Sequence, residues 1–420
     1  FPIVLLVLLP GFLIRMTRRG NYRHKFGQRF GIYSAGVREK LVGMNRVWVH
    51  AVSVGEVNVA LKLIQSLREE DPGLAFVLST TTSTGFKLAV SRKSAWLEPI
   101  YGPLDFYPIV RRVVRLIRPR CLILVEAEVW PNLVWEVRQF GAKTALVNAR
   151  LSPRSEMRYR LARWITAPIF NQLDLLCLQE PCDADRWKSL GLDPAKLVLT
   201  GSIKFDDGAT AHRTARDFRP VLDEIGVSVN APILLGGSTF EGEELILANV
   251  FKELRKSHPN LFLILVPRHH ERADSVARQL EQAGLVVMRR TKHFSEGKPD
   301  VLLVDTTGEL AGWYLCATVV FVGKSLCAQG GQNPAEPIAA GVPVIFGPHM
   351  QNFSTLVRAF LHKGGAMEVK DATGIRNAVT DLLASSNLRA DMVANAAKCL
   401  EIHRGATKKT TDLLQSRILL

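Results

Sequence analysis

Short apolar runs rich in β-branched residues recur along this chain from residue 46 onward, and stretches of helical periodicity separate them. Strands of a parallel sheet have this composition, because helices cover both faces of the sheet and so bury both. The first half of the sequence therefore predicts a parallel α/β sheet, with strands expected in RVWVHAV, AFVLST, CLILVEAE, KTALVNAR and LDLLCLQ.

The same pattern restarts in the second half, in PILLGGS, LFLILVP, LVVMRR, VLLVDT, ATVVFVG and VPVIFG. Residues 205–230 between the two sets have little sheet pattern and contain Gly208 and Pro220, which is typical of a linker. A length of 420 residues also exceeds what one hydrophobic core usually supports. We therefore expect two α/β domains, an N-terminal one over residues 21–205 and a C-terminal one over residues 206–420.

The first residues, FPIVLLVLLPGFLI, are apolar and uncharged, and a run of arginine and lysine without acidic residues follows them. The apolar run is shorter than the roughly 20 residues that span a bilayer. A buried core helix is the alternative, but Pro10 and Gly11 interrupt the run and the basic residues suit anionic lipid headgroups. We therefore expect residues 1–20 to form a membrane anchor, with the domains on the cytoplasmic side because the positive charges follow the anchor.

The formal net charge of +15 favours a polyanionic partner, which is a nucleic acid, a phosphorylated lipid or an anionic membrane surface. The six cysteines form no CxxC pair, and the adjacent His269 and His270 point in different directions. The sequence therefore indicates reduced thiols and no metal site.

Polar motifs follow the expected strands, where doubly wound domains bind their ligands. SVGE follows VWVHA, EVWPN follows CLILVEA, GGSTFEGEE follows PILL and PRHHER follows LFLILV. No motif matches GxGxxG, and VVFVGKSL has Thr318 where a phosphate-binding P-loop needs its first glycine. These departures argue against a dinucleotide oxidoreductase and against a P-loop NTPase.

Two glycine-rich segments in the second half are suited to an anion. In GGQNPAEP, paired glycines allow close backbone approach and Pro334 suits the first turn of a helix. In GGSTFEGEE, Ser238 and Thr239 are candidate helix N-caps. One such segment alone is better explained by capping, whereas two in one domain favour a nucleotide phosphate, with Glu336 placed to accept hydrogen bonds from ribose hydroxyls.

Taken together, the motifs HAVSVGE, EAEVWPN, NARLS, GSIKFD, GGSTFEGEE, PRHHER, DTTGEL, GGQNPAEP and GPHMQNF resemble the bacterial Kdo (3-deoxy-D-manno-octulosonic acid) transferase family in order and approximate spacing. The resemblance covers nearly the whole chain. It implies a GT-B fold, in which two Rossmann-like doubly wound domains face a central cleft, and the last helix is a candidate to pack back on the N-terminal domain.

The resemblance also implies the activity. It points to inverting glycosyl transfer, without metal or cofactor, of Kdo from CMP-Kdo to the lipid A precursor lipid IVA in lipopolysaccharide core biosynthesis. The expected location is the cytoplasmic face of the inner membrane. A phosphorylated glycolipid acceptor and membrane lipids account for the basic charge, so no nucleic-acid partner is needed.

The candidate site residues fall into two groups. Glu56, Glu126 and Glu128 lie at strand ends facing the cleft and are candidates for the catalytic base, although each could instead cap a helix or pair with Arg150. Lys204 is a candidate to pair with the donor phosphate or the Kdo carboxylate. The full set for donor and nucleotide binding is Lys204, Ser238, Arg268, Glu309, Gly330, Gly331, Gln332, Asn333 and Glu336.

The sequence departs from the family pattern at four motif positions. The family reads Gly-Glu-Arg-x-Gly near the N-terminus, with the acid as catalytic base, and this chain has Gln28 there, whose amide cannot accept the proton. Phe240, Lys324 and Gln332 stand where the family has histidine, glycine and histidine. Three hypotheses stay open: an active Kdo transferase, a catalytically degenerate paralogue that binds a CMP-sugar, and a GT-B transferase for another nucleotide sugar.

Overall fold

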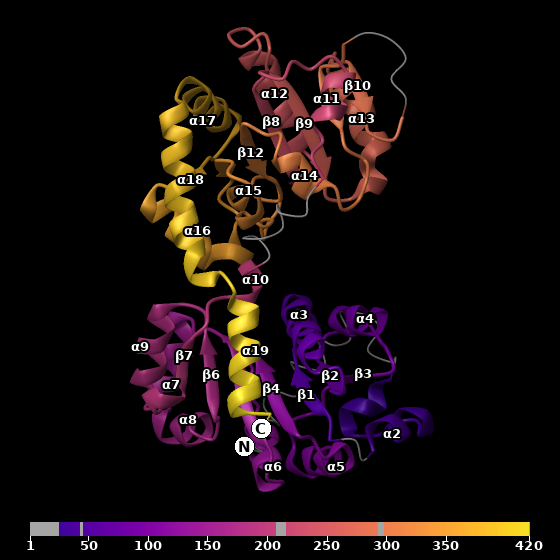
Figure 1. The fold of residues 1–420 in the computed structure, drawn as a ribbon, viewed down its shortest axis with the longest axis vertical. Helices are drawn as coiled ribbons and strands as arrows, with labels where there is room; N and C mark the ends of the chain where they lie inside the picture. The colour runs from indigo at the N-terminus through magenta and orange to yellow at the C-terminus, as the bar shows by residue number, and fades with distance from the viewer. Residues whose placement is uncertain (1–24, 43–44, 207–215, 293–297, 420) are drawn as a thin grey trace. The chain divides into compact units, whose positions relative to one another are not determined.

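The computed structural model describes residues 25–42, 45–206, 216–292 and 298–419, and Figure 1 shows its ribbon. The chain forms two compact units, which are unit 1 (residues 1–204 and 405–420) and unit 2 (residues 205–404). Each contains a seven-stranded sheet in which all paired strands run parallel. The predicted α/β class with two parallel sheets is confirmed.

The sheet of unit 1 has the order β3-β2-β1-β4-β5-β6-β7. Its strand order reverses between β1 and β4, so the carboxyl ends of these two strands flank the topological switch point, where open α/β sheets bind ligands. Val47 of β1 pairs with Phe76 of β2 on one side and with Cys121 of β4 on the other. The strands are β1 (Val47–His50), β2 (Phe76–Thr80), β3 (Leu97–Tyr101), β4 (Cys121–Val125), β5 (Lys143–Ala149), β6 (Leu175–Leu178) and β7 (Leu197–Leu199).

Helices cover both faces of this sheet. Val49 and Leu63 belong to one buried cluster, and Trp48 and Val134 belong to the cluster on the other face, because successive strand residues point to opposite faces. The helices are η1 (Phe26–Phe30), α2 (Ala35–Leu41), α3 (Val54–Glu70), α4 (Ser83–Ser91), α5 (Tyr107–Ile117), α6 (Pro131–Gln139), α7 (Pro153–Leu161), α8 (Arg163–Phe170), α9 (Pro181–Ser189), η2 (Pro194–Lys196) and α19 (Ala406–Arg417).

Helix α19 belongs to unit 1 although it follows unit 2 in the sequence. In Figure 1 it is the yellow helix among the indigo and magenta elements. Leu414 is fully buried in the same cluster as Leu63, and the Thr411 hydroxyl donates to Ser66 Oγ at 3.0 Å. The hydrophobic core of unit 1 is therefore built from two separate parts of the sequence.

The sheet of unit 2 has the order β10-β11-β9-β8-β12-β13-β14, and its switch point lies between β8 and β12. The strands are β8 (Ile233–Thr239), β9 (Phe262–Pro267), β10 (Val287–Arg289), β11 (Val301–Leu303), β12 (Val319–Val322), β13 (Val344–Phe346) and β14 (Met367–Glu368). The helices are α10 (Ile203–Asp206, which begins in unit 1), α11 (Arg219–Glu224), α12 (Glu243–Leu254), η5 (His270–Arg272), α13 (Ala273–Gln282), α14 (Leu310–Tyr314), α15 (Ala335–Ala339), η6 (Gln351–Phe353), α16 (Ser354–Lys363), α17 (Ala372–Ala384), α18 (Ser386–Leu400) and η7 (Glu401–His403).

The segment expected as a linker is packed where the structure describes it. Phe218 is 2% exposed and stacks on Trp313, with ring centroids 4.4 Å apart, and α11 follows it directly. Apolar side chains bury this stretch in the core of unit 2 despite its glycine and proline residues. The expectation of a linker over residues 216–230 was wrong.

Within the described ranges no helix is both long enough and apolar enough to cross a bilayer. The expected anchor at residues 1–20 lies outside these ranges.

Candidate functional site

Three acidic side chains gather at the switch point of unit 1. Glu56 lies in the first turn of α3 after β1, and Glu126 and Glu128 follow β4 directly. Burial, together with the neighbouring charges of Glu126 and Glu128, raises the pKa of Glu56 to about 7, although hydrogen bonds from Val52 and Ser53 act in the opposite direction. We call these three residues the carboxylate cluster.

Glu56 is held by the N-terminus of its own helix. Its Oε2 accepts from the Val52 N–H at 2.8 Å, its Oε1 accepts from the Ser53 hydroxyl at 2.8 Å, and Ser53 Oγ accepts from the Glu56 N–H at 3.3 Å. This reciprocal arrangement is a variant of the capping box in which the carboxylate binds the N–H of Val52, the residue before the N-cap. Both carboxylate oxygens are therefore engaged in a structural role.

Glu126 pairs with a cation and has unusual backbone geometry. Its carboxylate lies 3.4 Å from Arg150 Nε, and its φ of 63° falls in the left-handed region, which costs energy for a residue other than glycine. Lys204 also belongs here: burial lowers the pKa of its ammonium, the Glu126 charge raises it, and the Arg150 charge lowers it. Two basic side chains therefore accompany the carboxylate cluster.

Glu128 differs from both neighbours because it makes no hydrogen bond or ion pair with any residue that the structure describes. Burial raises the pKa of its carboxyl group, and the Glu126 charge raises it further. A carboxylate with a raised pKa and unoccupied oxygens is a stronger base than an ordinary carboxylate and is suited to accept a proton from a bound hydroxyl.

Gln28 lies in η1, at the carboxyl ends of β2 and β3. Its side chain is 4% exposed, and its Oε1 accepts from the Tyr101 N–H at 2.9 Å. The neighbouring Arg29 donates to the Thr81 carbonyl at 2.6 Å and lies 4.5 Å from the centroid of the Tyr101 ring. The GQRFG segment is thus fixed to the same edge of the sheet as the carboxylate cluster, two strands from β1.

His50 is a residue at this edge that sequence reasoning missed. It ends β1, its Nδ1 lies 2.7 Å from Ser79 Oγ, and its ring makes an edge contact with Trp130. Burial lowers its pKa to about 4, so the imidazole is neutral at pH 7. The available signal was that His50 begins the HAVSVGE motif at the end of β1.

In unit 2 a buried carboxylate ties together the loops at the switch point. Glu243 is fully buried and accepts from the N–H groups of Phe240 and Lys324 at 2.8 Å, and from those of Ser325 and Leu326 at 3.0 Å. The loop after β12 is therefore fixed to the loop after β8. Sequence reasoning missed this role, because the two loops are more than 80 residues apart.

Ser238 and Thr239 were expected as helix N-caps, and this expectation was wrong. Both belong to strand β8, and α12 begins at Glu243 with Gly242 as its N-cap. Ser238 has a φ of 51°, and the Thr239 hydroxyl donates to Glu244 Oε1 at 3.0 Å. Three residues separate the end of β8 from the start of α12, so the N-cap falls at Gly242 and not at Ser238 or Thr239.

The glycine loop, residues 330–333, follows β12 and is held by its backbone. The Gly331 N–H donates to the Lys324 carbonyl at 2.9 Å, and the Gln332 N–H donates to the Gly323 carbonyl at 3.1 Å. A Cβ on Gly331 would lie 2.3 Å from the Met350 sulfur, and the φ of Gly331 is 70°, so only glycine fits. The expected phosphate contact of this loop stays a prediction.

Asn333 and Glu336 lie together at the start of α15. Asn333 Nδ2 donates to Glu336 Oε1 at 3.0 Å, and Asn333 Oδ1 accepts from the Ala335 N–H at 3.1 Å. Burial raises the pKa of Tyr314 well above its usual value, and the Glu336 charge adds to this. A Cβ on Gly237 would lie 2.9 Å from the Tyr314 hydroxyl, so the structure brings both glycine-rich segments to one place.

The other donor-side candidates lie on loops of unit 2. Arg268 follows β9 with an exposed side chain, and its N–H donates to the Thr239 carbonyl at 3.0 Å. Glu309 accepts from the Thr306 hydroxyl at 2.6 Å and lies 3.4 Å from Arg290 Nε.

Two of the residues that differ from the family pattern, Lys324 and Phe240, contact each other. The Lys324 ammonium lies 5.0 Å from the centroid of the Phe240 ring, which also makes an edge contact with His269. Lys324 has a φ of 57°, a left-handed conformation that favours glycine. The Lys324 ammonium group therefore lies beside the loop that follows β8.

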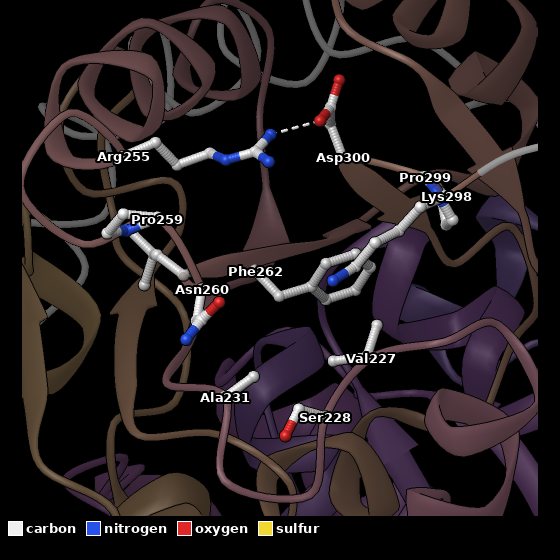
Figure 2. A pocket seen from close by; sticks show the side chains of 11 residues that line it. Val227, Ser228, Ala231, Arg255, Pro259, Asn260, Phe262, Lys298, Pro299 and Asp300 are labelled. Atoms are coloured by element: carbon white, nitrogen blue, oxygen red, sulfur yellow. Dashed lines mark hydrogen bonds and ion pairs between the residues drawn. The ribbon is translucent and has the colours of Figure 1, made fainter.

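A small cavity in unit 2 lies away from these loops. Figure 2 shows it beside the ion pair between Arg255 and Asp300, and Phe262 in its wall begins β9. It therefore lies at the amino ends of the strands, and its volume of about 20 Å³ holds about one water molecule. This cavity is not a candidate ligand site.

No cluster of three or more histidine, cysteine, aspartate or glutamate side chains that could hold a metal ion occurs in the described ranges.

Comparison with known proteins gives relatives along the whole chain. Residues 24–207 match the family described as 3-Deoxy-D-manno-octulosonic-acid transferase (kdotransferase). A 3-deoxy-D-manno-octulosonic acid transferase of Bordetella pertussis is 36% identical over 420 residues, which cover 96% of this chain and 94% of the relative. The enzyme of the same name from Haemophilus influenzae is 32% identical over 94% of this chain and 92% of the relative.

Among solved structures, the UDP-GlcNAc 2-epimerase from Neisseria meningitidis bound to UDP-GlcNAc is 13% identical and has a TM-score of 0.56. The alignment covers 88% of this chain and all of that chain. At 13% identity this likeness shows a shared fold and nothing more.

Proposed function

This chain belongs to the 3-deoxy-D-manno-octulosonic acid transferase family, and we propose that it moves Kdo from CMP-Kdo to the lipid A precursor lipid IVA in lipopolysaccharide core biosynthesis. It is a glycosyltransferase that transfers Kdo. The observation that carries this conclusion is the 36% identity over 96% of the chain with a Kdo transferase.

In the proposed reaction, an acceptor hydroxyl oxygen attacks the anomeric carbon of Kdo as the bond from that carbon to the phosphate oxygen breaks. CMP leaves with the electrons of the broken bond, and the configuration inverts. The hydroxyl proton must pass to a base. We propose Glu128, because Glu56 has both oxygens engaged, Glu126 is paired with Arg150, and Gln28 is an amide.

Within this reaction the donor binds to unit 2. The candidate contacts lie at or just beyond the carboxyl ends of its strands: Ser238 near the end of β8, Arg268 after β9, and the glycine loop and Glu336 after β12. Lys204, beside Glu126, is proposed to pair with the donor phosphate or the Kdo carboxylate.

We further propose that the protein works at the cytoplasmic face of the inner membrane. The support is the sequence of residues 1–29, where an apolar run precedes basic residues with no acidic residue among them.

The direct test is to incubate the purified full chain with CMP-Kdo and tetra-acylated lipid A precursor and to weigh the lipid product by mass spectrometry. We expect the lipid mass to increase by one or more Kdo residues. Binding of CMP without any change in the lipid would instead support a catalytically degenerate paralogue, which Gln28 in the position of the family acid favours. Calorimetric titration with CMP, UMP and UDP tests the third hypothesis, because tighter binding of a uridine nucleotide would point to another donor.

A further inference from the structure

Helices α7 and α8 of unit 1 expose an unusual set of large apolar side chains. Leu161 is 81% exposed and Trp164 is 80% exposed, and Met157 and Ile165 are about half exposed. Met157 and Leu161 are four residues apart in α7 and therefore lie on the same face of that helix. We call these four residues, with the arginines of the next paragraph, the α7–α8 surface; both helices are labelled in Figure 1.

The charged residues of these helices are almost all positive. Four exposed arginines, none of which makes an ion pair with a described residue, surround the apolar side chains. The acid in this stretch, Glu156, is half-buried and engaged by Ser189 at 3.2 Å and by Arg186 at 3.7 Å. The arginines are Arg154, Arg158, Arg160 and Arg163.

Protruding tryptophan and leucine side chains surrounded by unpaired arginines match the surface of an anionic bilayer. Tryptophan is enriched at the boundary between headgroups and acyl chains, and arginine binds lipid phosphates. A second copy of this chain fits less well, because a symmetric contact through this surface would bring its arginines against one another.

The α7–α8 surface also adjoins the carboxylate cluster. Arg150, three residues before α7, pairs with Glu126 at 3.4 Å. Tyr159 of α7 lies close enough to Glu128 for the carboxylate charge to raise the pKa of its hydroxyl, together with burial. A bilayer that contacts α7 and α8 is therefore near the residues to which we assign the chemistry.

We propose that the α7–α8 surface docks on an anionic lipid bilayer, with Leu161 and Trp164 inserted at the level of the headgroups and the arginines bound to lipid phosphates. This contact is separate from residues 1–24. Its catalytic purpose, which is to hold Glu128 beside a lipid-linked acceptor, rests on the proposed function; the lipid contact itself does not.

The first test measures tryptophan fluorescence of the full chain with vesicles of phosphatidylethanolamine and phosphatidylglycerol whose acyl chains carry bromine, a short-range quencher. We expect quenching, of which Trp164→Phe removes more than half. Trp96→Phe is the matched control, because Trp96 is a half-buried tryptophan of unit 1 that packs on Phe76, and its quenching effect should be small. Because the readout is local to Trp164, it remains informative if residues 1–24 also bind the membrane.

The second test concerns charge. The double variant Arg158→Glu and Arg160→Glu should lower the affinity for the anionic vesicles at least several-fold. The double variant Arg38→Glu and Arg92→Glu, which makes the same change of charge at exposed arginines elsewhere in unit 1, should leave it unchanged. Equal loss of binding in both would show that only net charge matters and would overturn the proposal. Quenching that Trp164→Phe does not reduce would also overturn it, as would a Leu161→Asp variant that dissociates a dimer in the absence of lipid.

The third test separates this inference from the proposed function. Leu161→Asp should raise KM for an acceptor embedded in vesicles and leave kcat for the same acceptor dispersed in detergent unchanged. Quenching at Trp164 in a protein that transfers no Kdo would leave the lipid contact standing and refute the proposed function. Normal transfer to vesicles by Leu161→Asp would refute the docking role and leave the proposed function standing.

Discussion

Glu128 in unit 1 is a half-buried carboxylate and Glu243 in unit 2 a fully buried one, each near the switch point of its sheet, and their surroundings are opposite. Glu243 accepts hydrogen bonds from five backbone N–H groups, the fifth being that of Cys327 at 3.5 Å, whereas Glu128 has no hydrogen-bond partner among the described residues. A carboxylate with satisfied oxygens fixes loops, and one with free oxygens and a raised pKa is available for proton transfer. The same residue type is thus a scaffold in one unit and a candidate base in the other.

The largest expected effect comes from removing the proposed base. Glu128→Gln should lower kcat by about 10²–10⁴, the usual contribution of a positioned base, and leave CMP affinity unchanged. The matched variant Glu243→Gln should instead lower stability by roughly 1–3 kcal/mol, because an amide cannot satisfy its N–H donors, and should weaken CMP binding.

Single-turnover kinetics, CMP titration and urea unfolding on both variants check this contrast. If Glu243→Gln lost rate without losing stability, or if Glu128→Gln kept its rate, the division between scaffold and base would be refuted.

The second expected effect is a pH dependence of stability from Glu56. Burial raises its pKa in the folded protein from 4.5 to about 7. The folded state therefore holds this proton more tightly than the unfolded state, and stability falls as pH rises from about 4.5 to about 7. The shift corresponds to roughly 3 kcal/mol.

Glu56→Gln imitates the protonated acid, so it should be about as stable as the parent at pH 5 and more stable than it at pH 8. Urea unfolding at both pH values measures the difference. If the free energies of unfolding of Glu56→Gln and the parent differed by the same amount at pH 5 and at pH 8, folding would not raise the pKa of Glu56.

The third expected effect concerns unit 2. Glu336→Ala should weaken CMP binding by roughly 1–3 kcal/mol, because it removes the acceptors proposed for the ribose hydroxyls. Glu281→Ala, which removes an exposed carboxylate from α13, is the control and should bind CMP normally. Unchanged CMP affinity in a folded Glu336→Ala protein would exclude this role.

The smallest expected effect is an increase in the rate of transfer. In Gln28→Glu, the carboxylate can still accept the Tyr101 N–H, so the fold should be retained, and it adds a base at the position of the family acid. We expect transfer to rise roughly tenfold, part of the usual contribution of a base.

In the Glu128→Gln background the same change should restore part of the lost rate. Single-turnover transfer at several pH values compares the four proteins. Equal rates with and without the change in both backgrounds would show that residue 28 has no part in proton transfer.

The sequence predicted most strands of both sheets, because buried parallel strands are continuous apolar runs. It missed β3, β7 and β14, of which the last two are only three and two residues long. In β3, LEPIY, Glu98 and Pro99 break the pattern. The structure buries Glu98 and pairs it with Lys93 at 2.7 Å, a contact that no strand pattern reveals.

The candidate site was predictable to the extent that local motifs specify it. Ser53 and Glu56 have the spacing of a capping box, and the structure shows a variant of it. The free oxygens of Glu128 and the five hydrogen bonds of Glu243 could not be predicted, because both depend on segments that are distant in the sequence.

The place of α19 in unit 1 sets an order for folding during synthesis. Residues 405–420 complete the core of unit 1 but follow all of unit 2, so the ribosome must release unit 2 before the first-made unit can close its hydrophobic core. Until then the apolar side chains of α3 that α19 covers stay open to water and to other nascent chains. Unit 2, a single uninterrupted stretch, has no such delay, so the second unit to be made is expected to be the first to finish folding.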